Sequence, residues 1–212
     1  MQWTEQQDRK PEEPSVTIKR VVLYALLIPW TVGLSTTAAT PSIAASSEAG
    51  GAAFTLTSTA FTEGGVIPKV HECTSGGNDP RQKNESPPLA WTGGPTAAQS
   101  YALVMRDLDN RNLIHWVIYD IPVNVASLPQ NVEHVYTPSV PSGARQVYYR
   151  GSASLFGYQG PCSPGSVNTY EFVIYALNKA TLSELDSSSS TQTAARAITN
   201  ATLGSAKLTG ES

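Results

Sequence analysis

The stretch YALVMRDLDNRNLIHWVIYDIP, residues 101–122, contains two runs of apolar and β-branched residues separated by a short polar segment. Runs of this kind, bounded by Asp and Asn, are typical of β-strands joined by a turn. Residues 101–107 and 115–121 are therefore predicted to be two strands of one hairpin. The first run is almost continuously apolar, which indicates a strand that is buried on both faces of its sheet.

Further strands are predicted from the same pattern, each bounded by Gly, Pro, Asn or Asp: they cover residues 54–59, 145–151 and 170–177. Residues 72–88 and 157–167 are rich in Gly, Pro and Ser, and we expect both segments to be loops. Helical periodicity is confined to residues 182–187 and 191–204. The sequence thus predicts a mainly β fold, an antiparallel β-sandwich with a few short peripheral helices.

The composition of the 212-residue chain excludes several classes of protein. Only 15% of the residues are charged, while 16 are Gly and 15 are Pro, which argues against a coiled coil, a charged disordered chain or a bundle of long helices. A net charge of -3 gives no basic surface for nucleic acid. The sequence has no Gly-rich phosphate loop and no HExxH motif, so we expect no cofactor and no metal.

The first 45 residues differ from the rest of the chain. A polar leader ends in Lys19-Arg20, residues 21–34 carry no charge, and an Ala- and Ser-rich linker follows. This order is typical of an export signal. As a helix the apolar run would span about 21 Å, which is short of a hydrocarbon core of about 30 Å. We therefore predict that residues 1–45 direct export to the periplasm or outside the cell, and that residues 50–212 fold as a β domain. The alternative is a membrane anchor at residues 21–34.

The chemical state of the two cysteines, Cys73 and Cys162, depends on whether the protein is exported. In an exported protein they could form a disulfide, whereas in the cytoplasm they would remain thiols. They are far apart in sequence and have no nearby His pair, so a zinc site is not expected. Asn84-Glu85-Ser86 and Asn200-Ala201-Thr202 are glycosylation sequons, which matter only in a glycosylating cell.

Polar residues end or begin three of the apolar strands. Asp107 follows the run at 101–106, and His115 opens the next run, so a hairpin would bring both to the same edge. A carboxylate there could accept a hydrogen bond from His115 and fix the tautomer of the ring. The alternative is a solvated turn beside a buried, satisfied histidine. The third polar group, Asn168-Thr169-Tyr170, ends the long Gly- and Pro-rich loop.

Five blocks in this order resemble the phosphatidylethanolamine-binding protein family, also called the Raf kinase inhibitor-like family, and its bacterial branch in particular. The blocks are SPPLAW (86–91), YALVMRDLDN (101–110), HWVIYDIP (115–122), GYQGPCSPGSVNTY (157–170) and FVIYALN (172–178). The resemblance covers residues 53–210. It implies a large central antiparallel sheet, a smaller second sheet, and a small pocket at one end that accepts anionic groups such as phosphate headgroups.

The resemblance also implies which residues form this pocket. The ligand-binding residues carried over from the family's motifs, or expected to wall the pocket, are Asp107, His115, Gly160, Pro161, Tyr170, Trp91 and Tyr158. The sequence departs from the family at Asn168 and Thr169, which stand where the family has His and Arg. Asn168 can donate and accept hydrogen bonds, and we include it in the site, but it adds no charge.

These features predict a non-enzymatic, exported binding protein for a small anionic or phosphorylated ligand. The alternative is a protease- or kinase-inhibitor-like interaction module that binds an unidentified protein through its surface loops. A hydrolase would need a nucleophile beside Asp107 and His115, and the sequence supplies none there. Contact with a membrane is expected only through an uncleaved N-terminal segment.

Overall fold

The computed structural model describes residues 53–74, 79–149, 155–162 and 165–212. The predicted export signal, residues 1–45, lies outside this range. The described elements, in chain order, are β1 (Thr55–Ser58), β2 (Gly65–Val66), a 3-10 helix η1 (Lys69–His71), β3 (Leu89–Thr92), β4 (Ser100–Asp107), β5 (Leu113–Pro122), β6 (Ser127–Leu128), β7 (Arg145–Gln146), β8 (Thr169–Leu177), α1 (Thr191–Asn200) and β9 (Thr202–Glu211).

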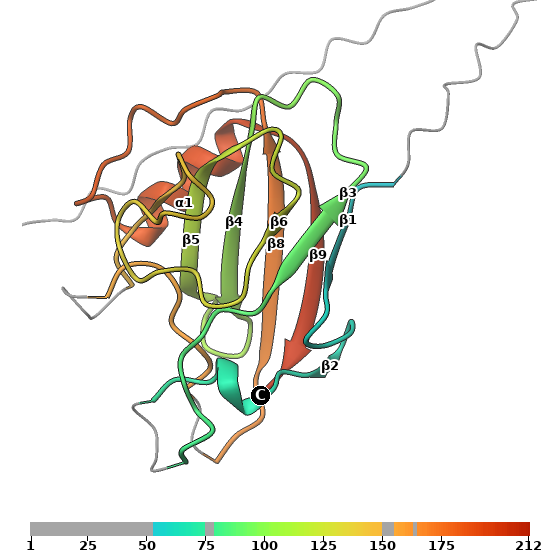
Figure 1. Ribbon diagram of the computed structural model, residues 1–212, viewed down its shortest axis with the longest axis vertical. Coiled ribbons are helices and arrows are strands. Elements are labelled where there is room, and N and C mark those ends of the chain that lie inside the picture. The colour runs from blue at the N-terminus through green and yellow to red at the C-terminus, as the bar shows by residue number, and fades with distance from the viewer. Residues whose placement is uncertain (1–52, 75–78, 150–154, 163–164) are drawn as a thin grey trace, which may run out of the picture. The chain divides into compact units, whose positions relative to one another are not determined.

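The strands form two sheets, as expected (Figure 1). The larger sheet has the order β2-β9-β8-β4-β5-β7, and the smaller has the order β1-β3-β6. All pairs are antiparallel except β2 with β9, which run parallel at Gly65–Val66. The predicted β-sandwich of a large central sheet and a smaller one is therefore confirmed, although the larger sheet is mixed at its edge.

Strand β4 shows why the central strands are continuously apolar. Leu103 and Met105 lie in the core cluster shared with the smaller sheet, whereas Ala102 and Val104 lie in the cluster shared with α1. Because side chains alternate between the two faces of a strand, burial of both faces requires apolar residues at every position.

The helix α1 begins at a conventional N-cap and covers one face of the larger sheet. The Ser190 side chain accepts a hydrogen bond from the backbone of Thr193, and the buried residues Ala194 and Ile198 join the second core cluster. The predicted helix over 191–204 is wrong at its end, because α1 stops at Asn200 and the chain enters β9 at Thr202. Strand β9 pairs along the whole of β8, and this long-range pairing outweighs the local helical pattern.

Two other predictions were wrong in their extent or type. Residues 182–187 form turns rather than a helix, because Ser and Asp side chains bond to neighbouring backbone groups, as Asp186 does with the amide of Ser188. The strand predicted at 145–151 is limited to Arg145–Gln146, followed by an isolated bridge between Tyr148 and Phe156, and its last two residues lie outside the described range.

Candidate functional site

Asp107 ends β4, and its buried carboxylate organises the turn that follows. One oxygen, Oδ1, accepts the backbone N–H groups of Asp109 and Asn110 at 3.0 and 3.1 Å, which is the bonding by which Asp commonly begins a turn. The other oxygen, Oδ2, accepts a hydrogen bond from the Asn168 side-chain amide at 2.9 Å. Asn168 therefore lies next to Asp107 and helps to satisfy the hydrogen-bonding capacity of this buried carboxyl group.

His115 lies near the start of β5 and is 2% exposed. Its Nδ1 atom is 2.9 Å from the backbone oxygen of Gln159. A carbonyl oxygen only accepts hydrogen bonds, so Nδ1 carries a proton. The other ring nitrogen, Nε2, is buried and has no hydrogen-bond partner in the described part of the chain. The ring therefore presents one nitrogen that nothing in the described protein satisfies.

The electrostatic surroundings of His115 favour the neutral ring. Burial lowers the pKa of His115 below its usual range, and the hydrogen bond to Gln159 and the charge of Asp107 only partly oppose this. At neutral pH the ring is uncharged, and Nε2 then offers a lone pair.

The possible hydrogen bond between Asp107 and His115 is not formed. The pairing of β4 with β5 is irregular between Met105 and Arg106, and His115 lies in this irregularity rather than opposite a residue of β4. Since the oxygens of Asp107 accept hydrogen bonds from the turn and from Asn168, the tautomer of His115 is fixed by Gln159 instead.

Tyr170 lies beside both Asp107 and His115. It lies directly opposite Asp107 in the register of β8 with β4, and it is fully buried. Its ring meets the His115 ring edge to face, with the centroids 5.4 Å apart, and the ring of Tyr149 lies 5.6 Å from the same histidine. The imidazole is thus held between aromatic rings, which restricts its rotation.

The Gly160-Pro161 loop is held tightly against the segment that follows η1. A Cβ atom at position 160 would lie 2.1 Å from the backbone oxygen of His71, so only glycine fits this close approach. The oxygen of Pro161 accepts the N–H of Cys73 at 2.9 Å. Cys73 and Cys162 form a disulfide, which confirms the pairing that the sequence allowed.

Trp91 and Tyr158 do not line the site in the way expected. Trp91 packs edge-on against Tyr101, which lies at the opposite end of β4 from Asp107. Tyr158 is buried beneath the loop, where its hydroxyl donates to the oxygen of His71 at 2.7 Å. Through this bond Tyr158 supports the loop.

Two residues that the sequence did not assign to the site complete the arrangement. Asn84 accepts the N–H of Gly160 on its Oδ1 atom at 2.7 Å, and Gln159 supplies the carbonyl that binds His115. Asn84 has a φ of 57°, a left-handed conformation that Asn tolerates better than most residues. That preference, in a loop rich in turn-forming residues, is the one signal that could have indicated it.

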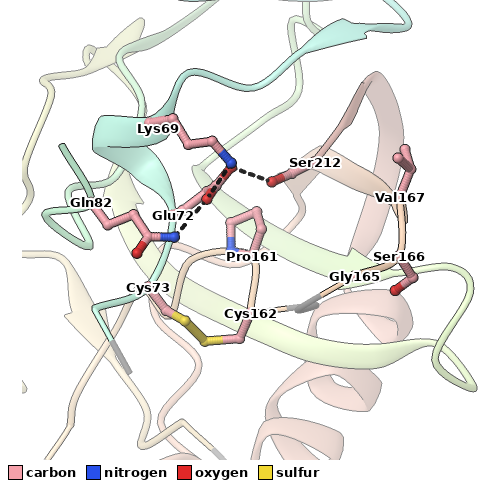
Figure 2. A pocket seen from close by; sticks show the side chains of 10 residues that line it. All are labelled: Lys69, Glu72, Cys73, Gln82, Pro161, Cys162, Gly165, Ser166, Val167 and Ser212. Atoms are coloured by element: carbon pink, nitrogen blue, oxygen red, sulfur yellow. Dashed lines mark hydrogen bonds and ion pairs between the residues drawn. A yellow bond between two sulfur atoms is a disulfide. The ribbon is translucent and has the colours of Figure 1, made fainter. Parts of the chain in front are cut away.

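A separate cavity of about 380 Å³ lies beside the disulfide (Figure 2). At its edge Glu72 accepts hydrogen bonds from Lys69, Gln82 and Ser212. The lining residues are Lys69, Glu72, Cys73, Gln82, Pro161, Cys162, Gly165, Ser166, Val167 and Ser212. Asp107, His115 and Tyr170 are not among them, so this cavity borders the Pro161 loop but is not the site around His115.

Within the described ranges, no group of three or more His, Cys, Asp or Glu residues is arranged to hold a metal ion. No helix in that part of the chain is long and apolar enough to cross a membrane.

The fold and this site define a class of β-sandwich protein with a candidate small-ligand site at one end of its larger sheet. Residues 57–212 match the family described as phosphatidylethanolamine-binding protein, and the chain belongs to this family. The resemblance noted in the sequence is thereby confirmed.

The relatives include archaeal and bacterial proteins. A UPF0098 protein of Methanothermobacter thermautotrophicus is 36% identical over 153 residues, which cover 71% of this chain and 93% of that protein. A Mycobacterium tuberculosis protein named as a lipoprotein, LppC, is 32% identical over 161 residues, which cover 74% of this chain and 70% of the relative. The disulfide between Cys73 and Cys162 of this chain is consistent with the predicted export, because disulfides persist in oxidising compartments.

Solved structures share the fold. YbcL of E. coli, described as a new member of the mammalian PEBP family, superposes with a TM-score of 0.65 at 25% identity, covering 74% of this chain and 96% of its own. The PEBP homologue CT736 of Chlamydia trachomatis gives a TM-score of 0.61 at 28% identity, covering 76% and 97%.

Proposed function

We propose that this chain is a non-enzymatic binding protein that holds a small anion, such as the phosphate of a lipid headgroup, against the Nε2 atom of His115. The observation that carries the proposal is that this nitrogen is buried and without a partner among the described residues. A buried polar atom without a hydrogen bond costs about 1–3 kcal/mol. A ligand oxygen placed there would remove that cost.

The chemistry of this binding requires one proton. A neutral His115 presents a lone pair, which repels an anionic oxygen, so the complex must contain either an imidazolium or a protonated phosphate oxygen. Asp107 lies close enough to favour the imidazolium. Its own carboxylate accepts three hydrogen bonds from the protein, so it need not contact the ligand. For an anion that carries no proton, binding and uptake of one proton by His115 are therefore coupled.

The family relationship supports a binding role, since the family is described by its binding of phosphatidylethanolamine. The altered residues indicate weaker binding, because Asn168 and Thr169 supply no positive charge where the family has His and Arg. With a few hydrogen bonds and no committed cation, we expect dissociation constants from about micromolar to millimolar, equivalent to about 4–8 kcal/mol.

The proposal is tested by titrating the full chain with inorganic phosphate and with phosphoethanolamine while the NMR signals of the His115 ring are followed. We expect saturable shifts at His115, Gly160 and Tyr170, and loss of binding in His115→Gln. Trp91→Phe is the matched control, since Trp91 lies at the other end of β4, and it should bind as the unmodified chain does. A ligand concentration of roughly 50 mM lies above the expected dissociation constants, so the absence of saturable shifts at that concentration would overturn the proposal. The inhibitor-like alternative would then be the next to test.

A further inference from the structure

Asn84 connects three separate parts of the chain. Its backbone N–H donates to the oxygen of Glu72 at 2.8 Å, which anchors the residue in its left-handed conformation. Its side chain reaches the loop before Pro161, where Oδ1 accepts the N–H of Gly160 at 2.7 Å and Nδ2 donates to the oxygen of Tyr158 at 3.4 Å. The shorter of these two contacts is the one made to Gly160.

The N–H of Gly160 belongs to the same peptide group as the carbonyl of Gln159. That carbonyl accepts the hydrogen bond from Nδ1 of His115 at 2.9 Å. Asn84 and His115 therefore bind opposite ends of one planar peptide unit, whose orientation they fix together. A hydrogen bond accepted at one end of a peptide also polarises the other end, strengthening the second bond by roughly 10–30%.

We propose that Asn84 is a positioning residue that acts through the Gln159–Gly160 peptide to keep the His115 proton on Nδ1 and to leave Nε2 facing the ligand. The use of Nε2 by a ligand rests on the function proposed above. The effect of Asn84 on the tautomer does not, and it can be measured without ligand.

Backbone bonds anchor the chain on both sides of this peptide: the N–H of Gln159 donates to the oxygen of His115 at 3.1 Å, and the oxygen of Pro161 accepts from Cys73. Asp107 does not bond to the histidine, and the ring contact of Tyr170 restrains the plane of the imidazole without choosing between its nitrogens. Gly160 is buried, so loss of the Asn84 oxygen would leave its N–H without a partner among the described residues. Loss of that bond would let the peptide tilt between its anchors and weaken the bond from Nδ1 of His115 to the carbonyl of Gln159.

Asn84 is also held from its other side. Its backbone oxygen lies 3.2 Å from Nε2 of His134, whose Nδ1 is 3.2 Å from the oxygen of Phe156. These contacts fix the backbone at position 84, so a change of its side chain alone is expected to alter the contact to Gly160 while leaving the chain path intact.

The left-handed backbone of Asn84 offers a matched pair of variants. Asn84→Gly accepts this conformation and removes the side chain, whereas Asn84→Asp tolerates it and keeps an oxygen in place of Oδ1. A long-range ¹H–¹⁵N correlation spectrum of the full chain, without ligand, reports which ring nitrogen of His115 carries the proton. The His115 signal is assigned by its loss in His115→Gln.

In the unmodified chain we expect the Nδ1–H form to dominate. Asn84→Gly should lower the ratio of Nδ1–H to Nε2–H by about two- to five-fold, the effect of weakening one ordinary hydrogen bond, and Asn84→Asp should retain the original ratio. An unchanged ratio in Asn84→Gly, or an equal loss in Asn84→Asp, would overturn the proposal. If Asn84→Gly does not fold, Asn84→Ser, whose side chain is too short to reach Gly160, provides the same comparison.

A phosphate titration of the same proteins separates the two proposals. A tautomer change in Asn84→Gly, together with no phosphate binding by the unmodified chain, would refute the function and support the role of Asn84. Phosphate binding at His115 by the unmodified chain, together with no tautomer change in Asn84→Gly, would support the proposed function and refute the role of Asn84.

Discussion

The Nδ1 atom of His115 lies 2.9 Å from the carbonyl oxygen of Gln159, although the two residues are 44 positions apart in sequence. A backbone group rather than the carboxylate of Asp107 thus determines which nitrogen of the ring is protonated. Because a backbone carbonyl cannot be removed by substitution, the geometry of the 158–162 loop controls the chemistry of this histidine.

The close approach of Gly160 to His71 predicts a steric penalty. Gly160→Ala would place a methyl group 2.1 Å from a backbone oxygen, so the loop must move. We expect a loss of about 3 kcal/mol or more in the free energy of unfolding, at the upper end for overpacking. Urea unfolding measures this loss. Gly165→Ala is the control: it meets no atom within 4 Å and should cost only the strain of its positive φ, about 1–2 kcal/mol. Equal losses in both variants would contradict the close approach.

The disulfide between Cys73 and Cys162 joins residues 89 apart in sequence. Cross-links of this kind commonly stabilise a fold by about 2–4 kcal/mol, chiefly by restricting the unfolded chain. The double variant Cys73→Ala/Cys162→Ala should therefore melt about 4–16 °C lower than the unmodified protein. Thermal unfolding with and without reductant measures the difference. A melting temperature that neither the substitution nor the reductant changes would show that the bond does not form.

The free energy of unfolding should fall as the pH decreases from about 7 toward 5.5. Burial lowers the pKa of His71 and that of His115 in the folded protein. The unfolded chain, with ordinary histidine pKa values near 6.5, therefore takes up protons before the folded state does, which favours unfolding as acid is added. Urea unfolding at several pH values measures the slope, and His71→Gln should reduce it. A flat profile, or stability that rises with acid, would show that the two rings are not buried as described.

The hairpin could be predicted from the sequence, because it follows from two apolar runs joined by a short polar segment. Asp107 ends one of these runs. Tyr170 begins another run and was indicated by the resemblance to the family; the register of β4 with β8 places the two residues opposite each other. Gln159 could not be predicted, since it acts through a backbone atom that every residue possesses. Trp91 occurs in a block shared with the family, yet the pairing of β3 with β1 carries it to the far end of β4, beside Tyr101.

The end of α1 shows a different limit. Residues 191–204 have a helical pattern throughout, and only the long-range pairing of Thr202 with Leu177 converts the last residues into β9. A helix continued to residue 204 would place Leu203 on one loose stripe with Ala195 and Ile198, both of which are buried, whereas in β9 Leu203 is 41% exposed. The periodicity of a short segment carries no information about a partner strand that lies far away along the chain.

The most direct test of the account is the pH titration of the His115 ring with and without a saturating anion. Sulfate serves as the anion, with inorganic phosphate for comparison, because sulfate does not titrate in this range. An anion at Nε2 stabilises the imidazolium, so the pKa of His115 should rise on binding, and affinity should increase as the pH falls from neutral, by up to about ten-fold per pH unit. An unchanged or lowered pKa of His115 at saturating anion would contradict the claim that this nitrogen is the binding atom.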